Sequence, residues 1–279
     1  MSQDSSSSEE LRLGKHTPIY HHDPEKKTFQ ILLKFQNKPG SLASILDHFA
    51  KNRLDILSSF SYNEKDYSVW SGFVQHEDQS HGAREIGEIT RNAKHLISHR
   101  VSVSERGLLI DTLTFPVVSG GSSRYIMMSA EHLQRMMMKI VETFGSGGES
   151  ILFNEGLTIG EATAQSQVTA FGKQYVLDLF SYTFAFYSAI GWGRAQLVRF
   201  EPMGFTAVIR MHECFECAGQ HQVEPRSMFI KGHLAGVLES LFERKITVRE
   251  TMCLAIGDPY CEFLAKSERL EDSAPRASS

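Results

Sequence analysis

The first half of the chain alternates between strand-like and helix-like patterns of apolar residues. Apolar residues occupy every second position from Phe29 to Phe35, which is typical of a half-buried β-strand. A turn follows, and Ser41 then stands where it can cap a helix. The apolar residues of that helix are spaced to share one face: Leu42, Ile45, Leu46 and Phe49. The pattern therefore predicts a strand, a turn and a helix at the start of this region.

Four further elements complete the region. The pattern predicts a hairpin of strands at 54–62 and 67–76, a helix over about 82–93 and a closing strand over 100–110. The resulting order, βαββαβ, is that of a two-layer α+β sandwich with an antiparallel sheet.

A cluster of Gly and Ser, VVSGGSSR at 117–124, separates this region from a second one and predicts a linker. The second region has the pattern of a mixed α/β domain. Its predicted elements are helices at about 130–144, 175–190 and 227–242 and strands at 195–201, 206–212, 246–250 and 262–265. The polar segments 1–26 and 268–279 are expected to be mobile tails. The sequence thus predicts two domains, at 27–116 and at 125–267.

Composition narrows the classes of function. The chain has 279 residues, of which 41% are hydrophobic, enough to fill two cores. A formal net charge of −4 without a basic stripe disfavours direct nucleic-acid binding. No apolar stretch is long enough to span a membrane, and the N-terminus lacks the apolar segment of a signal peptide. We therefore expect a cytoplasmic protein whose cysteines are thiols or metal ligands rather than disulfides.

All four cysteines lie between positions 214 and 261. Cys214 and Cys217 form a C-x-x-C pair, Cys253 and Cys261 form C-x7-C, and Glu250 stands three residues before Cys253. Thiolates at such paired spacings, with or without a carboxylate, suit a tetrahedral Zn²⁺ site. Free cysteines also pack in cores without any ligand role. Because the rest of the chain contains no cysteine, the pattern favours metal binding.

In the first region, the segment FQNKPGSLASILDHFAKNRLDILSSFSY resembles an ACT domain, and the resemblance covers about residues 28–110. In that family the loop after the first strand lines a small-molecule site at a dimer interface. The resemblance implies a homodimer and a site for an amino acid, lined by Asn37, Gly40, Ser41 and Leu42. Gly40 would let the backbone approach the ligand, and the helix N-terminus would receive a carboxylate. The Pro-Gly pair also suits a tight turn at a dimer contact, and Asn37 replaces the Asp that is commoner in the family.

In the second region, residues 225–263 resemble a vinyl-4-reductase domain, with a weaker resemblance back to about residue 124. The matching motifs are Gly232-x3-Gly236, Glu250-x2-Cys253 and Gly257-Asp258-x2-Cys261-x-Phe263. Such domains, whose fold is similar to that of TRAPP components, occur in a pigment-biosynthesis vinyl reductase component and in aromatic-sensing bacterial regulators. In those regulators a Glu-x2-Cys-x7-Cys set and a cysteine at the start of the long helix hold structural zinc beside the ligand pocket.

The resemblance implies a zinc site that this chain completes differently. Glu250, Cys253 and Cys261 match position for position, but Ser227 stands where the helix cysteine belongs. Serine is a poor zinc ligand, so we expect Cys217 to supply the missing thiolate, with Cys214 as the second candidate. The resulting site of structural zinc would have three thiolates and one carboxylate, or four thiolates.

Two features of the second region have both a packing and a ligand-binding interpretation. Residues 175–192 carry seven aromatic side chains, which either fill a core or line a cavity for an apolar or planar ligand. Gly232 and Gly236 leave a smooth helix face that a second helix or a flat ligand can approach. The ligand-binding interpretation assigns these residues to the pocket: Phe184, Tyr187, Trp192, Gly232 and Gly236. The nearby His233 is expected to be a surface or hydrogen-bonded histidine.

The leading hypothesis is a regulatory small-molecule sensor, with an ACT dimerisation or effector module and a zinc-stabilised ligand-binding domain. Its expected partners are a small apolar or aromatic molecule and a second copy of the chain. One alternative is an enzyme or enzyme subunit related to a tetrapyrrole vinyl reductase, and another is a dimeric scaffold that senses nothing. No dinucleotide-binding fingerprint or P-loop is present, and no catalytic residue is assigned, so an enzyme is the less favoured class.

Overall fold

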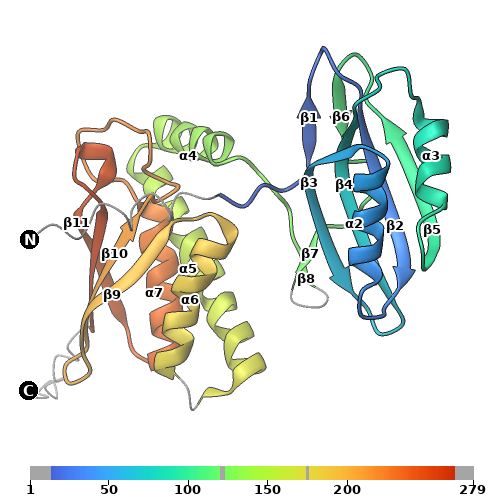
Figure 1. The fold of residues 1–279 in the computed structure, drawn as a ribbon. Coiled ribbons are helices and arrows are strands. Elements are labelled where there is room, and N and C mark those ends of the chain that lie inside the picture. Colours follow the sequence, from blue (N-terminus) through green and yellow to red (C-terminus); the bar gives the residue numbers. More distant parts are fainter. Residues whose placement is uncertain (1–13, 120–122, 174–175, 268–279) are drawn as a thin grey trace, which may run out of the picture. The chain divides into compact units, whose positions relative to one another are not determined.

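A computed structural model describes residues 14–119, 123–173 and 176–267, and the chain divides into two compact units, residues 1–126 and 127–279 (Figure 1). The predicted linker at 117–124 falls within the first unit. There the two-residue strands β7 (Val118–Ser119) and β8 (Ser123–Arg124) pair with each other, and residues 120–122 lie outside the described part. The predicted tails at 1–13 and 268–279 also lie outside it.

The first unit contains an antiparallel four-stranded sheet with the order β3-β4-β2-β5. Its elements are β2 (Thr28–Gln36), α2 (Ser41–Lys51), β3 (Leu54–Asn63), β4 (Tyr67–His76), α3 (Ala83–Arg91) and β5 (Leu96–Val103). Both helices cover the same face of the sheet (Figure 1). Ile45 and Phe49 of α2 and Ile86 of α3 are buried there against the alternating apolar residues of β2. The predicted βαββαβ order is therefore present, because each element buries the face that its pattern marks as apolar.

The structure corrects two boundaries in the first unit. The closing strand, predicted to run to residue 110, ends at Val103, and β6 (Leu108–Ile110) follows a turn at Gly107. Strand β6 pairs with β1 (Tyr20–His22), which lies in the segment expected to be a mobile tail. A three-residue strand whose partner lies almost 90 positions away leaves too short a pattern to recognise.

The second unit combines four helices with a second antiparallel sheet, in the order β11-β12-β10-β9 (Figure 1). The helices are α4 (Ala130–Phe144), α5 (Ser146–Phe171), α6 (Val176–Ile190) and α7 (Met228–Phe242). The strands are β9 (Arg194–Glu201), β10 (Thr206–His212), β11 (Ile246–Met252) and β12 (Cys261–Ser267), with a short 3-10 helix at Leu254–Ile256. Helix α7 is buried along most of its length and forms the centre of the core. No helix in the described part of the chain is long and apolar enough to cross a membrane.

Helix α5 is the one long described element that the sequence analysis missed. Its buried face consists of small residues at intervals of four with a single leucine: Gly148, Leu152, Gly156, Gly160 and Ala164. A stripe of this kind has no hydrophobic periodicity, and glycine disfavours a helix by about 1 kcal/mol relative to alanine. The stripe exists because α5 packs with its backbone almost in contact with α7. A Cβ atom at Gly156 would lie 2.1 Å from the carbonyl oxygen of Phe229, so only glycine fits there.

Candidate functional site

Four side chains meet in the interior of the second unit: Cys217, Glu250, Cys253 and Cys261, here named the Cys-Glu cluster. All four are buried, and their donor atoms lie within 4.8 Å of one another. The sulfur atoms of Cys217 and Cys253 are 3.5 Å apart. In a tetrahedral zinc site with Zn–S bonds near 2.3 Å, neighbouring sulfur atoms are about 3.8 Å apart. The cluster could therefore hold a metal ion.

Strand pairing brings these residues together from three segments. Cys261 begins β12, where it pairs with Met211 of β10, and Cys217 lies in the turn after β10. Glu250 lies near the end of β11, which pairs with the other edge of β12. The β11 register shifts just after Glu250, and such a bulge re-aims the side chains around it. The cluster thus depends on the central position of β12 in the sheet.

Ser227, the residue that replaces the expected helix cysteine, lies directly beside the cluster. Its hydroxyl donates to Glu250 Oε1 at 2.6 Å, and its backbone N–H donates to Glu250 Oε2 at 3.1 Å. The same hydroxyl lies 2.9 Å from the sulfur of Cys217. Ser227 therefore holds the carboxylate in place from the start of α7 while Cys217 occupies the neighbouring corner.

The electrostatics of the cluster favour a cation. Burial raises the pKa of Glu250, although the hydrogen bonds from Ser227 act in the opposite direction. The backbone N–H of Leu254 points at the sulfur of Cys261, 3.5 Å away, and Asp258 accepts from the backbone N–H of Cys253 at 2.7 Å. These contacts fix the loop that carries two of the thiols. A bound divalent cation would stabilise the thiolates and the carboxylate in their charged forms.

The C-x-x-C segment contributes more than one ligand candidate. Cys214 is fully buried and outside the set of four, but its thiol interacts with the thiols of Cys217 and Cys261. Between the two cysteines, Glu216 accepts hydrogen bonds from the backbone N–H groups of Phe229 and Ile230, each at 3.0 Å. Burial raises the pKa of Glu216 to about 8, although these bonds lower it. Glu216 thus satisfies the first turn of α7, a role that sequence spacing gave no means of finding.

A second group, the aromatic cluster, consists of Phe184, Tyr187, Trp192 and His233. The hydroxyl of Tyr187 lies 2.7 Å from Nδ1 of His233, and the rings of Tyr187 and Trp192 stack with centroids 5.5 Å apart. The ring of Trp192 also meets that of His233 edge to face at 5.0 Å. His233 Nε2 lies 3.3 Å from the hydroxyl of Thr163 on α5. Three of the residues predicted to bind a ligand therefore lie together, around a hydrogen-bonded histidine.

The two helix glycines predicted for the pocket lie against α5. A Cβ atom would lie 2.0 Å from the carbonyl oxygen of Phe153 at Gly232, and 2.1 Å from that of Leu157 at Gly236. Together with Gly156 and Gly160 of α5, they form a contact here named the α5–α7 seam. The geometry supports the packing interpretation of both glycines, and their contact with a ligand stays a prediction.

A small cavity of about 40 Å³ lies beside the Cys-Glu cluster, lined by residues of α4, α5 and the C-x-x-C segment, including Met137, Glu216 and Cys217. Gln134 of α4 holds this region closed. Its side-chain amide donates to the carbonyl oxygens of Phe215 at 2.5 Å and Ala218 at 2.9 Å. Helix α4 therefore lies over the side of the cluster that Cys217 occupies.

The loop after the first strand of the first unit is a tight turn. The backbone N–H of Ser41 donates to the carbonyl oxygen of Lys38 at 3.1 Å, and Gly40 has φ 82° and ψ −7°, as at the third position of a type II turn. Asn37 donates through its side-chain amide to the carbonyl oxygen of Glu64 at 2.8 Å. Leu42 packs partly against the core. These contacts support the turn interpretation, and ligand binding by this loop stays a prediction.

Ser41 does not cap the helix that it begins. Gly40 occupies the capping position without any side-chain hydrogen bond, and Ser41 is the first helical residue. Its side chain is buried, and its hydroxyl oxygen has no hydrogen-bond partner among the described residues. The prediction from residue type was wrong by one position, because the φ of +82° that the turn requires puts glycine at the cap.

His233 should make the stability of the second unit depend on pH. Burial lowers its pKa from 6.5 to about 4, so between these values the unfolded chain binds a proton that the folded chain does not. Stability from this residue is present above pH 6.5 and is lost as the pH falls toward 4, by up to about 3 kcal/mol. Urea unfolding at several pH values between 4 and 7.5 measures this slope.

The His233→Asn variant provides the control for that slope. The variant lacks the titrating group, so its stability should fall less steeply on acidification, while any protonation at the Cys-Glu cluster affects both proteins alike. Equal slopes in the two proteins would show that His233 is not held neutral in the fold.

A model of the vinyl-4-reductase domain matches residues 207–267, the segment that contains β10, α7, β11, β12 and all four residues of the Cys-Glu cluster. The second unit contains a vinyl-4-reductase domain. The uncharacterized protein MJ0150 of Methanocaldococcus jannaschii is 31% identical over 129 residues, which cover 46% of this chain and 70% of that protein. This chain belongs to the same family as MJ0150. The uncharacterized protein MJ1642 of the same organism is 33% identical over 98 residues, and the match spans 33% of this chain and only 58% of MJ1642.

Two solved structures are similar to the chain that carries this vinyl-4-reductase domain. The phenol-responsive sensory domain of the transcription activator PoxR, with phenol, is 19% identical, with a TM-score of 0.47 over 55% of this chain and 81% of that one. A vinyl-4-reductase family protein of Methanocaldococcus jannaschii is 18% identical, with a TM-score of 0.38 over 52% of this chain and 84% of that one.

Proposed function

We propose that the protein is a regulatory small-molecule sensor whose vinyl-4-reductase domain is stabilised by zinc. The observation that carries the proposal is the coincidence of the family match at 207–267 with a buried set of three thiols and one carboxylate within 4.8 Å. Four protein ligands saturate a tetrahedral zinc ion and leave no position for a reactive water. Zinc held in this way by Cys217, Glu250, Cys253 and Cys261 is structural, which favours a binding domain over a hydrolytic enzyme.

The aromatic cluster is the proposed recognition site for the ligand. Tyr187 and His233 are buried, and the low pKa of about 4 keeps His233 neutral near pH 7. A neutral imidazole and a phenol hydroxyl can each donate or accept a hydrogen bond, and the surrounding rings offer flat apolar surfaces. These features suit a small planar molecule with a single polar group, for which phenol is the simplest probe.

The first unit is the proposed ACT-type module. Its βαββαβ element order and its β3-β4-β2-β5 sheet support this assignment, and the Pro-Gly turn before α2 lies where the family places its dimer contact. In this proposal the module forms a homodimer and transmits the occupancy of the vinyl-4-reductase domain. An amino acid bound at its first loop would modulate the same response.

A thermal-shift screen of the zinc-loaded full chain tests the sensor proposal. The panel contains phenols, aromatic acids, amino acids and tetrapyrroles. Phenol at 100 times its dissociation constant should stabilise the protein by about 2.7 kcal/mol, which raises the unfolding midpoint by several degrees. One variant sharpens the result. Tyr187→Phe keeps the aromatic surface but loses the hydroxyl, so it should bind phenol more weakly than the wild type.

The same screen separates the alternatives. Stabilisation by no compound would contradict the sensor proposal and leave a scaffold. Reduction of a vinyl-bearing tetrapyrrole in the presence of a reductant would contradict it in favour of an enzyme. Stabilisation by an amino acid that depends on Asn37 and not on Tyr187 would place the ligand in the first unit instead.

A further inference from the structure

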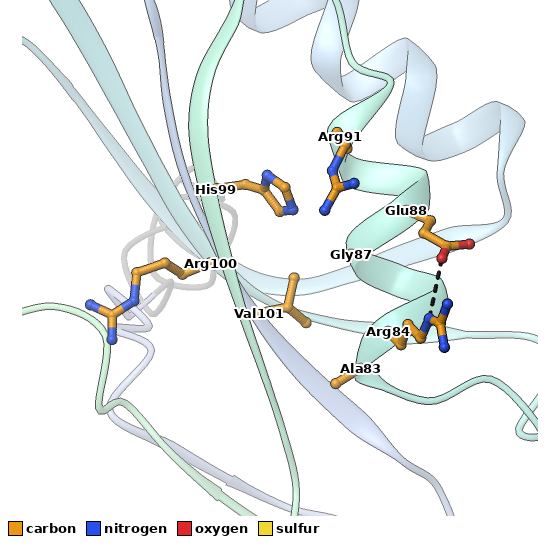
Figure 2. Close-up of a pocket in the computed structure, with 8 residues that line it drawn as sticks. All are labelled: Ala83, Arg84, Gly87, Glu88, Arg91, His99, Arg100 and Val101. Atoms are coloured by element: carbon orange, nitrogen blue, oxygen red, sulfur yellow. Dashed lines mark hydrogen bonds and ion pairs between the residues drawn. The ribbon is translucent and has the colours of Figure 1, made fainter.

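A groove of about 410 Å³ lies in the first unit between α3 and β5, away from every residue assigned above (Figure 2). Its lining residues are Ala83, Arg84, Gly87, Glu88, Arg91, His99, Arg100 and Val101. Strand β5 is an edge of its sheet, so one side of the groove is open. A volume in this range accommodates a small metabolite.

The walls of the groove place one cation and one imidazole face to face. Figure 2 shows the side chains of Arg91 from α3 and His99 from β5 pointing toward each other across the groove, while Arg100 points to the opposite side of the strand. Gly87 keeps the helix wall low. A Cβ atom there would have no neighbour closer than Nε2 of His99 at 3.9 Å, so the space above His99 is open.

The charges in the groove are not balanced from within. On α3, Arg84 pairs with Glu88 at 3.4 Å on the outer side of the helix. Arg91 has neither a hydrogen bond nor an ion pair with any residue that the structure describes. Burial lowers the pKa of His99, and the positive charge of Arg91 lowers it further. The imidazole therefore faces an arginine whose charge no carboxylate neutralises.

We propose that this groove binds a phosphate group, carried by a small molecule, between the guanidinium of Arg91 and the imidazole of His99. A guanidinium presents parallel N–H donors that match two phosphate oxygens. The dianion of phosphate also favours a proton on His99, which would turn the imidazole into a second charged donor. The remaining space along Ala83 and Val101 is apolar and would accommodate the rest of the molecule. This inference concerns the first unit alone and does not depend on the sensor proposal.

The test is an NMR titration of the full-length chain with inorganic phosphate, with the His99 ring proton resonance as the readout and His99→Gln to assign it. Phosphate should shift this resonance saturably and raise the pKa of His99. The Arg91→Ala variant should bind phosphate at least about tenfold more weakly, because it loses a charged hydrogen-bond donor. Arg91 is exposed, so the variant should fold normally.

The matched control is Arg84→Ala, which removes the same charge from the same helix but outside the proposed contact. It should retain phosphate affinity within about twofold, because Glu88 already neutralises Arg84. Equal losses in both variants would indicate diffuse electrostatic attraction and overturn the site. The absence of any response of His99 to phosphate, or an equal response to acetate, would also overturn it.

A third arm identifies the source of the phosphate. A phosphate monoester such as glycerol 3-phosphate should bind more tightly than inorganic phosphate if the rest of the ligand contacts Ala83 and Val101. Equal affinities would assign the groove to free phosphate, and both results would support the phosphate contact itself.

Discussion

Replacing Cys253 with Ser is expected to release the metal ion and to unfold the vinyl-4-reductase domain. Binding of structural zinc contributes about 10–16 kcal/mol in small zinc domains, which is comparable with the whole stability of a typical domain of about 5–15 kcal/mol. Loss of one of four ligands weakens that binding and leaves a buried carboxylate and two thiols without their cation. Elemental analysis should find about one zinc ion per chain in the wild type and much less in the variant. Circular dichroism should show the accompanying loss of structure.

The control is Cys214→Ser, which changes a buried thiol outside the Cys-Glu cluster. This variant should keep its zinc and lose only about 1–3 kcal/mol from burying a hydroxyl. Retention of zinc by Cys217→Ser together with its loss in Cys214→Ser would exchange the roles of these two cysteines. A wild-type chain without zinc, or a stable Cys253→Ser chain with full zinc, would contradict the structural zinc site.

Substitution of Gly232 by Ala is expected to disrupt the second unit by separating two helix backbones. The new methyl group would lie 2.0 Å from the carbonyl oxygen of Phe153, and no side-chain rotation can relieve a contact between two backbones. Overpacking in a core typically costs about 1–3 kcal/mol, and this geometry should reach at least the upper end of that range. The free energy of unfolding in urea, measured on the zinc-loaded protein, gives the cost.

Gly147→Ala on α5 is the matched control for that substitution. A Cβ atom at Gly147 would meet only the Cβ of Phe144, at 4.0 Å, so the new methyl group fits. The helix should gain about 0.5–1 kcal/mol because alanine loses less backbone entropy than glycine. If the variants of Gly232 and Gly147 were equally stable, the α5–α7 seam would be looser than the structure shows.

The elements that the sequence predicted are those that bury an apolar face. Strands β2 and β4 and helices α2, α4 and α7 follow their hydrophobic patterns to within a few residues, because packing on one face imposes the period of the element. Helix α5 was missed for the opposite reason, since its contact with α7 is made by backbone and glycine. Strand β1 was missed because three residues carry no period.

The candidate site divides in the same way. Glu250, Cys253 and Cys261 lie close together in the sequence, and their spacing indicated a shared metal before their geometry was known. The positions of Ser227, Glu216 and His233 depend on how α7 is placed against the sheet and α5, so their roles needed the tertiary structure. The histidine in particular had no sequence signal to distinguish a buried hydrogen-bonding residue from an exposed one.

The α5–α7 seam has a mechanical consequence for the second unit. Four glycines lock the two helices at backbone contact, so α7 cannot slide or rotate without carrying α5 with it. One end of α7 touches the Cys-Glu cluster through Ser227, and its next turns carry His233 into the aromatic cluster. The metal end and the aromatic end are therefore two ends of one stiff double rod, and a displacement at either end is felt at the other.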